Sequence, residues 1–485
     1  MRVLIVDTFY TPYLQQIYSC SSLVHQSWFN QHKAHFSNGF GTGDAYSYGL
    51  SRLGVEAIEI VANSAVLQLA WAREHEPALL ELSSGIQQLL LILEAQIRWW
   101  KPSVLYVQDI NWLPAAFLHH AKSLVEMLVG QNACPLSPGL DLSPYDLLLT
   151  SLPHYVDLFR RKGVRSAYFP IGFDERLLRR HRTDAARHHA LTFVGGLGGS
   201  HSQGTRMLEE IARYLPLQVW GYGVDKLAHS SVLRSRWQGE AWAFQMYELL
   251  ATSLITINRH INIADCYANN MRLYEATGMG ACLLTDAKSN LATLFEPDQE
   301  VVTYNSVPEA LSKLNQLLKY PKQAAAIAQR GQLRTLRDHT YSKHLKLLVE
   351  LLQLHNPRFQ ARRVRDQHIL VVCSQELAHR MPQSLKSVLS SQHLQRRYAL
   401  LTDNTTQFTT FRNMSRWCIP NNADPIPVVK SCLDAFSPTL VLTVQIIDEF
   451  IPADHWLVSV QREAHSREIL SLPVHAVPLQ MEKPR

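Results

Sequence analysis

The chain has 485 residues, of which 46% are hydrophobic and 18% are charged, enough apolar material for about three domains of ordinary size. The formal net charge is +6, a mild positive balance that suits anionic ligands or an acidic membrane surface. No run of aromatic residues interleaved with Lys and Arg indicates a nucleic-acid platform, so nucleic acid is excluded as an expected partner.

The 7 cysteines are scattered, and none forms a C-x-x-C pair. An odd count without such spacing argues against a disulfide framework and favours a reducing cytoplasm. The start, MRVLIVDTFY, is typical of a strand rather than a signal peptide, because Asp7 interrupts a short apolar run. No apolar stretch is long enough to span a bilayer. We therefore expect a cytoplasmic protein, with peripheral contact at the inner face of a membrane left open.

Residues 1–173 are expected to form a first α/β domain, because apolar strand-like runs alternate with helical stretches. The predicted strands are 2–7, 55–61, 103–111 and 145–151. Polar side chains, including Asp109, follow the third of these strands, and ligands of open α/β sheets bind at the carboxyl ends of strands. Asp109 therefore either caps the next helix or contributes to acceptor binding.

A glycine-rich loop at 37–44 precedes a predicted helix in this domain. Its glycines recur at every second position and lie far from the first strand, which is not the dinucleotide fingerprint. Asp44 ends the loop. It either caps the helix or faces a cleft, where it would orient an acceptor hydroxyl or act as a base.

Residues 174–190 are predicted to be a solvated linker, because most of the stretch is basic and lacks apolar periodicity. A second α/β domain is expected over 191–356. It opens with a strand, a loop that contains Gly195, Gly196 and Gly199, and a capping-box pattern, Ser200-x-x-Gln203. Glycines let backbone N–H groups approach an anion, and a helix N-terminus adds partial positive charge. The G-K-[ST] ending of a P-loop is absent.

Residues 254–286 are predicted to form a strand, a polar loop, a short helix, a glycine turn and a second strand. Arg259 and His260 lie in the polar loop, and Asp286 ends the second strand. Asn269 or Asn270 can cap a helix that begins at Met271 and stops at the glycines 278 and 280. This arrangement suits a phosphorylated ligand.

Arg272 and Glu275 are three residues apart on that short helix and share a face. One interpretation is a surface ion pair. The other is that Arg272 meets a phosphate while Glu275 accepts hydrogen bonds from both hydroxyls of a ribose.

The motifs NNMRLYEATGMGACLLTD, LFEPDQEVVTYNSVPEALSKL and RGQLRTLRDHTYSKH resemble the C-terminal half of GT-B glycosyltransferases. They are most similar to the CgeB-like, spore-maturation-type family among the group 1 glycosyl transferases. The resemblance covers Phe193 to about Leu352, is weaker over 1–190 and does not reach 366–485. It implies two Rossmann-like domains that face a cleft and a nucleotide-diphosphate sugar as donor, with no cofactor.

The resemblance also implies roles for single residues. Glu275 matches the ribose-binding glutamate of the wider retaining group, but Tyr267 stands eight residues earlier, where that group has a first glutamate. His201 and Arg206 match an H…R pattern after the glycine loop, and His154 matches a histidine that faces the donor. The candidates for donor binding are Gly195, Gly196, Gly199, His201, Arg206, His260, Asn270, Arg272, Glu275 and Asp286, and those for catalysis are Asp44, His154 and Arg259.

Three functions remain open from the sequence. The first is a metal-independent glycosyltransferase that acts on a glycan, lipid or protein acceptor, because no D-x-D or Cys/His metal pattern occurs. The second is a non-catalytic nucleotide-sugar-binding scaffold that kept the GT-B fold, and the third is an epimerase. Residues 366–485 are predicted to be a small α/β extension of unknown role.

Overall fold

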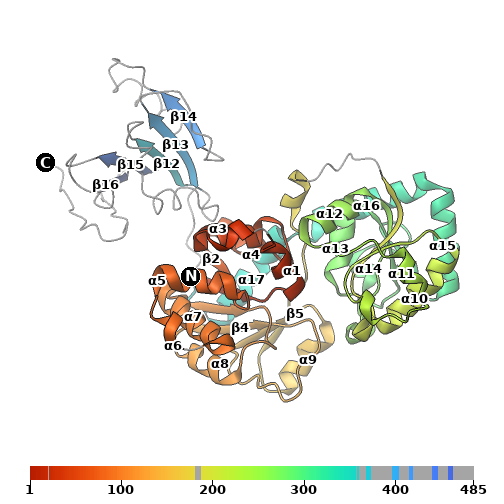
Figure 1. Cartoon of the computed structure of the whole chain (residues 1–485), viewed down its shortest axis with the longest axis horizontal. Helices are drawn as coiled ribbons and strands as arrows, with labels where there is room; N and C mark the ends of the chain where they lie inside the picture. Colours follow the sequence, from red (N-terminus) through yellow and green to blue (C-terminus); the bar gives the residue numbers. More distant parts are fainter. Residues whose placement is uncertain are drawn as a thin grey trace. The chain divides into compact units, whose positions relative to one another are not determined.

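The computed structural model describes residues 1–19, 21–82, 84–180, 187–356 and 358–359, and five strands between 367 and 462. The chain divides into two compact units (Figure 1). The first covers Met1–Leu50 and Val55–Ala361, and the second covers Ser51–Gly54 and Arg362–Arg485. The first unit contains two lobes, each built on its own sheet.

The first lobe is a parallel sheet of six strands in the order β2-β1-β3-β4-β5-β6. Its strands are β1 (Arg2–Asp7), β2 (Glu56–Val61), β3 (Val104–Val107), β4 (Met127–Gln131), β5 (Leu147–Thr150) and β6 (Ser166–Tyr168). Its helices are α1 (Thr11–Ile17), α2 (Ser21–Val24), α3 (Trp28–Ser37), α4 (Ala45–Arg52), α5 (Ala65–His75), α6 (Leu79–Leu82), α7 (Gly85–Trp100), α8 (Ala115–Lys122) and α9 (Pro153–Arg161).

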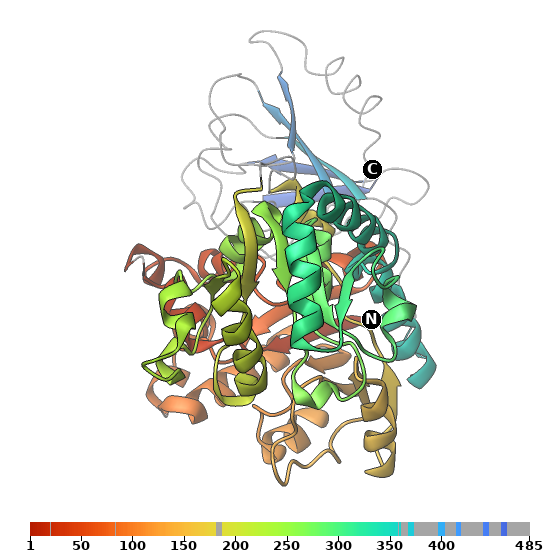
Figure 2. The same ribbon diagram turned by 90° about the vertical axis from the view of Figure 1, so that its right-hand side faces the viewer.

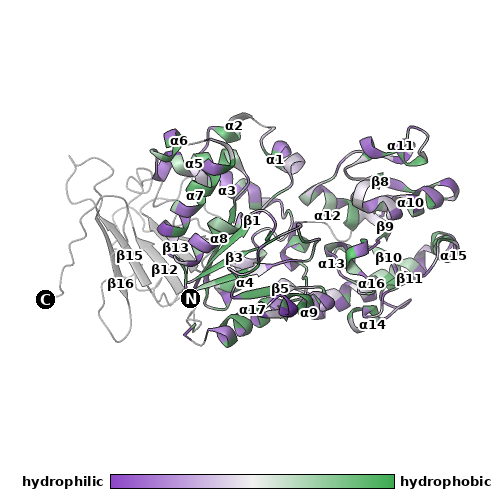
Figure 3. Ribbon diagram, turned by 90° about the horizontal axis from the view of Figure 1, so that it is seen from below, coloured by the Kyte–Doolittle hydropathy of each residue, from purple (hydrophilic) through white to green (hydrophobic). Residues whose placement is uncertain are grey.

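The central strands of this sheet are buried on both faces, as near-continuous Val, Ile and Leu runs require. All four residues of β3 and of β5 are buried. Leu4, Leu105 and Leu148 belong to one core cluster together with side chains of α7 and α8. Figure 3 shows the strands of this sheet in the colours of hydrophobic residues.

The second lobe is a parallel sheet of five strands in the order β11-β10-β9-β7-β8. Its strands are β7 (His189–Val194), β8 (Gln218–Trp220), β9 (Ser253–Ile257), β10 (Cys282–Asp286) and β11 (Val302–Tyr304). Its helices are α10 (Ser202–Tyr214), α11 (Val232–Arg236), α12 (Ala243–Thr252), α13 (Met271–Gly278), α14 (Leu291–Leu294), α15 (Val307–Lys319) and α16 (Pro321–Asp338).

Helices cover both faces of the second sheet (Figure 2). Side chains of α10, α11 and α15 form one core cluster with the sheet, and those of α12 and α13 form another. Because β9 lies between β7 and β10, the loops that follow these three strands meet at one edge of the sheet. The sequence placed its donor-binding candidates in and around these loops.

The last helix of the unit, α17 (Tyr341–His355), returns to the first lobe. The chain crosses between the lobes at a bridge, where the Phe173 N–H donates to the His339 carbonyl at 2.8 Å and the Tyr341 N–H to the Phe173 carbonyl at 3.0 Å. Leu345 then packs so closely on Gly49 of α4 that a Cβ there would lie 2.3 Å from Leu345 Cδ1. Two parallel α/β lobes joined in this way confirm the predicted GT-B type of fold.

The second unit contains a sheet in the order β14-β13-β12-β15-β16, in which β16 is antiparallel to β15. Its strands are β12 (Gln367–Val372), β13 (Arg396–Thr402), β14 (Met414–Cys418), β15 (Leu440–Gln445) and β16 (Leu457–Arg462). The helical part of the predicted C-terminal extension lies outside the described residues.

The segment between the lobes differs from the solvated linker that we expected at 174–190. A 3-10 turn, η1 (Glu175–Arg179), follows Asp174, whose side chain accepts from the Arg176 N–H. Leu177 is buried in the second lobe's core, and Arg187 donates to the carbonyls of Ser253 and Gly280. The basic residues here are thus partly used as internal hydrogen-bond donors. Residues 181–186 lie outside the described part.

Candidate functional site

Two glycine-containing loops are joined at the carboxyl ends of β7 and β8. The Gly195 N–H donates to the Trp220 carbonyl at 3.0 Å, and the Leu197 N–H donates to the Tyr222 carbonyl at 2.9 Å. Gly221 has a φ of +135°, and a Cβ there would lie 1.9 Å from the Gly195 carbonyl oxygen. Only glycine fits this close approach of two backbones.

The helix after the first loop begins later than the predicted capping box implied. A 3-10 turn, η2 (Gly199–His201), precedes α10, which starts at Ser202 with His201 as its N-cap and no side-chain hydrogen bond at the cap. Thr205 Oγ1 instead accepts from the Gly198 N–H at 2.9 Å. The start of a 13-residue helix therefore lies directly behind the glycine loop.

A small pocket lies at this loop and the start of α10. It is lined by Phe193, Gly196, His201, Gly204, Met207, Leu208, Arg259, His260 and Ile261. Arg259 lies against α10, since a Cβ on Gly204 would be 2.8 Å from its Nη1 atom. Burial and the positive charges of Arg259 and Lys226 lower the pKa of His201. We call this the glycine-loop pocket.

His260 and Asp286 form a buried pair at its edge. The His260 side chain is fully buried, and its Nδ1 lies 2.7 Å from Asp286 Oδ1, which also accepts from the His260 backbone N–H at 3.0 Å. Lys288 Nζ lies 3.4 Å from the other carboxylate oxygen. Burial opposes ionisation of Asp286, but the contacts with His260 outweigh it and lower the pKa of the carboxyl. His260 Nε2 is buried and has no hydrogen-bond partner in the described part of the chain.

The short helix α13 begins and ends as predicted. Asn270 is its N-cap, and its side chain accepts from the Leu273 N–H at 3.1 Å. Its amide group donates to Asn258 Oδ1 at 2.8 Å, which fixes the helix start against the end of β9. The structure thus uses Asn270 to position α13.

Arg272 and Glu275 do form an ion pair, at 2.8 Å, but it is not the surface pair of the simpler interpretation. Their side chains are only 15% and 9% exposed. Arg272 Nη1 also contacts Met246 Sδ at 3.0 Å, and the Tyr247 hydroxyl lies 3.4 Å from Glu275 Oε1. A second small pocket is lined by both lobes next to this glutamate. Its lining residues are Gly39, Gly41, Thr42, Gly172, Phe173, Asp174, Leu177, Tyr247, Met271, Glu275 and Tyr341.

Asp44 precedes α4 and is ion-paired. Its carboxylate lies 2.6 Å from Arg176 Nη2, which also contacts Asp174 at 2.7 Å. Burial alone would lower the pKa of Arg176, but the two carboxylates raise it. The guanidinium also stacks 4.1 Å from the ring centroid of Tyr48. The sequence could not indicate this partner, because Arg176 lay in a stretch that read as a linker.

His154, the second residue of α9, faces the second lobe. Its ring stacks on Tyr267, with the centroids 5.4 Å apart and an interplanar angle of 10°. Its Nδ1 is buried, and no described residue forms a hydrogen bond with it. Tyr267, which departs from the family pattern, therefore contacts the first lobe's histidine candidate.

Asp109 does not cap α8, whose N-cap is Pro114. Its carboxylate accepts from Thr8 Oγ1 at 2.8 Å and from the Asn111 N–H at 3.1 Å. Nearby, burial and the charge of Asp109 raise the pKa of Asp7 to about 7, against the backbone hydrogen bond from Thr8. Sequence reasoning missed Asp7, which reads simply as the end of a strand.

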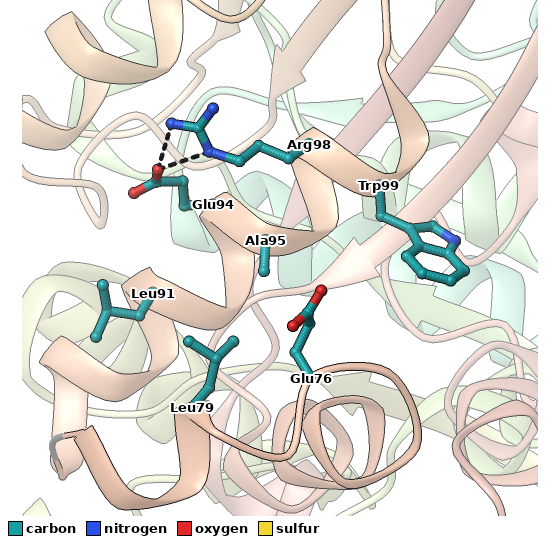
Figure 4. Close-up of a pocket in the computed structure, with 7 residues that line it drawn as sticks. All are labelled: Glu76, Leu79, Leu91, Glu94, Ala95, Arg98 and Trp99. Carbon is teal, nitrogen blue, oxygen red and sulfur yellow. Dashed lines mark hydrogen bonds and ion pairs between the residues drawn. The ribbon is translucent and has the colours of Figure 1, made fainter.

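The remaining donor candidate, Arg206, is exposed on α10 and lines neither pocket. A third pocket lies on α7 and the residues around α6 (Figure 4). Its Glu94 and Arg98 are paired with each other, and the rest of its lining includes Leu79, Leu91, Ala95 and Trp99. We place the candidate site at the strand ends, where the polar groups converge.

Two features are absent from the described residues. No helix among them has the length and apolar character needed to cross a membrane. No three His, Cys, Asp or Glu side chains in that part of the chain gather as they would around a metal ion.

Comparisons with known proteins bear on the second lobe. Residues 203–350 match a protein family described as "Glycosyl transferase-like". This part of the chain, from α10 to α17, is therefore similar to glycosyl transferases. No curated protein matches the chain.

Similar solved structures include Alr3699/HepE from Anabaena in complex with UDP and glucose, at 14% identity and a TM-score of 0.48, with 73% of this chain and 100% of that chain covered. AviGT4, a glycosyltransferase involved in avilamycin A biosynthesis, is 13% identical, with a TM-score of 0.46 and coverage of 74% and 98%. Sucrose-phosphate synthase from Thermosynechococcus elongatus is 8% identical, with a TM-score of 0.45 and coverage of 74% and 100%.

Proposed function

We propose that the chain is a glycosyltransferase that moves a sugar, of hexosyl type, from a nucleotide-diphosphate sugar to a glycan, lipid or protein acceptor. The observation that carries this proposal is the glycine-loop pocket, where Arg259, His260 and the start of α10 gather in a glycosyl transferase-like domain. Arginine, histidine and helix N–H groups suit a diphosphate. The narrower assignments, to the CgeB-like branch and to glycan biosynthesis at the cytoplasmic face of a membrane, are part of the same proposal.

In this proposal the leaving diphosphate is stabilised by Arg259, His260 and the helix start, so that a divalent ion is not required. Glu275 accepts the ribose hydroxyls, and Arg272 and Tyr247 keep its carboxylate in place. The acceptor binds the first lobe beside Asp44 and His154. Approach of the lobes would exclude water that otherwise hydrolyses the donor.

The first experiment is a thermal-shift screen with uridine, guanosine and thymidine diphosphates, followed by calorimetry with the best ligand. Glu275→Ala and Arg272→Ala are each expected to weaken binding at least about tenfold, because a charged hydrogen bond contributes about 1.5–3 kcal/mol. Glu94→Ala, in the Figure 4 pocket, is the matched control and should bind as the wild type does. Unchanged binding by both site variants would contradict the roles of Arg272 and Glu275.

A second candidate function is a nucleotide-sugar-binding scaffold without turnover. It is favoured by Tyr267, which stands where a catalytic glutamate occurs in the wider retaining group and whose ring is stacked on His154. Assays with a panel of nucleotide sugars and simple acceptors separate the two functions. Transfer, or slow donor hydrolysis, supports the enzyme, whereas binding without either supports the scaffold. Turnover that survives EDTA would support the metal-independent form.

A further inference from the structure

The pair of His260 and Asp286 has a feature that goes beyond the role of His260 in the proposed function. His260 is 2% exposed and lines the glycine-loop pocket, and its Nε2 has no hydrogen-bond partner among the residues that the structure describes. A buried polar atom without a partner costs about 1–3 kcal/mol. A ligand atom in this pocket would remove that cost.

The contact with Asp286 decides what Nε2 can offer. An ionised carboxylate is an acceptor only, so the ring nitrogen 2.7 Å from Asp286 Oδ1 carries a hydrogen. A neutral His260 then presents a lone pair at Nε2, and a protonated one presents an N–H. A phosphate oxygen accepts hydrogen bonds, so it pairs only with the protonated ring.

The charges around the pair favour a change from the neutral to the protonated ring when an anion binds. Arg259 adjoins His260, and His201 faces the same pocket from η2. Lys288 lies beside Asp286. The buried Tyr304 from β11 interacts with both Arg259 and Asp286. Arg259 and Lys288 are two cations close to the pair. A bound diphosphate offsets their positive charge, and Asp286 stabilises the imidazolium from the other side.

We propose that Asp286 is a positioning residue that directs His260 Nε2 at the donor's diphosphate, and that binding of the diphosphate is coupled to the uptake of one proton by His260. This inference rests on the proposed function. The proton comes from the solvent, the only new covalent bond is N–H at Nε2, and no other group is transferred. Affinity should therefore fall by up to about tenfold per pH unit once the free ring is neutral.

The test uses inorganic pyrophosphate as probe and calorimetry between pH 5.5 and 8.5 in two buffers of different ionisation enthalpy. His260→Gln is the control for the titration of pyrophosphate itself. The wild type is expected to take up about one proton more per bound pyrophosphate than this variant. Asp286→Asn keeps an acceptor for Nδ1 but lacks its charge, so it should move the uptake to lower pH and weaken binding at pH 7 about tenfold.

Equal proton uptake by the wild type and His260→Gln would overturn the inference while leaving the proposed function intact. Failure of the wild type to bind pyrophosphate would overturn it as well, whereas the proposed function fails only if no nucleotide diphosphate or nucleotide sugar binds. If the variants do not fold, the wild type labelled with ¹⁵N-histidine provides the readout. Pyrophosphate should then move one Nε2 resonance to the position of a protonated ring, and an unchanged spectrum would contradict the proposal.

Discussion

The charged side chains at the strand ends of the two lobes differ in how far they are already paired. In the first lobe, Asp44 is bound to Arg176, and Asp109 to Thr8 and Asn111. In the second lobe, Arg259 lines the glycine-loop pocket. Each lobe also has a histidine, His154 or His260, with one ring nitrogen that has no hydrogen-bond partner among the described residues.

This difference indicates which half is ready for a ligand. Polar groups that are satisfied within the protein must exchange partners before they bind anything, and each exchange costs much of what the new contact contributes. The second lobe can take an anion without such an exchange. The first lobe would have to release Asp44 from Arg176, or to use the His154 face, before an acceptor is bound. The four predictions that follow test this contrast, from the largest expected effect to the smallest.

The joined glycine loops of the second lobe should be the most sensitive point. Gly221→Ala places a Cβ 1.9 Å from the Gly195 carbonyl oxygen at a φ of +135°, and we expect a loss of at least about 3 kcal/mol of stability together with loss of diphosphate binding. Gly199→Ala is the control, since its φ is +52° but nothing lies within 4 Å of the added Cβ. Thermal unfolding and calorimetry measure both. Equal behaviour of the two variants would show that the loops are not rigidly joined.

The sequence predicted the features that local signals determine. Asn270 followed by Met271 gave the start of α13, and the glycine at 278 gave its end. Alternating apolar runs and helices gave the two parallel sheets. These features follow from chain-local chemistry, in which a capping side chain or a glycine acts on residues three or four positions away.

Pairings between distant residues could not be predicted. Asp44 and Arg176 are 132 positions apart, and the arginine lay in a basic stretch without periodicity. His260 and Asp286 were both named as donor contacts, but their mutual hydrogen bond depends on β9 and β10 being neighbours. The stack of Tyr267 on His154 likewise needs both lobes. Sequence reasoning therefore named residues that the structure brings together at the strand ends of the second lobe, and it missed how the candidates of the first lobe are paired.

The ion pair of the first lobe provides the second prediction. Arg176→Met leaves the carboxylates of Asp44 and Asp174 without their cation, and the three side chains are only 15–22% exposed. We expect urea unfolding to show a loss of about 2 kcal/mol, below the 3–5 kcal/mol of a fully buried pair. Arg98→Met removes a pair of similar length in which the arginine is 54% exposed, and should cost at most about 0.5 kcal/mol. If the two variants were equally stable, Asp44 would be free for an acceptor after all.

The third prediction concerns a buried carboxyl group that interacts with Asp44. Glu59 in β2 is 1% exposed, and burial together with the charge of Asp44 raises its pKa from 4.5 to about 8. The folded state retains a proton on Glu59 that the unfolded chain releases. The contribution of this proton to the stability of the fold is therefore fully present below pH 4.5 and is lost as the pH rises through 8.

Glu59→Gln mimics the protonated carboxyl and should remove this pH dependence. We expect its Tm to exceed that of the wild type by about 2–4 °C at pH 8.5 and to match it at pH 5. Calorimetric scans at both pH values measure the difference. The same ΔTm at both pH values would mean that Glu59 is ionised in the folded protein.

The smallest expected effect concerns the contact between the lobes at Tyr267. Its ring stacks on His154 at 5.4 Å, and aromatic pairs contribute about 0.5–1.5 kcal/mol beyond the area they bury. A double-mutant cycle with Tyr267→Ala and His154→Ala should therefore give a coupling of about 1 kcal/mol in chemical unfolding. Bound diphosphate should leave this coupling energy unchanged if His154 stays stacked on Tyr267 when the donor site is occupied. A coupling that vanishes on binding would instead mean that His154 is released for the reaction, and that the first lobe is less occupied than its contacts indicate.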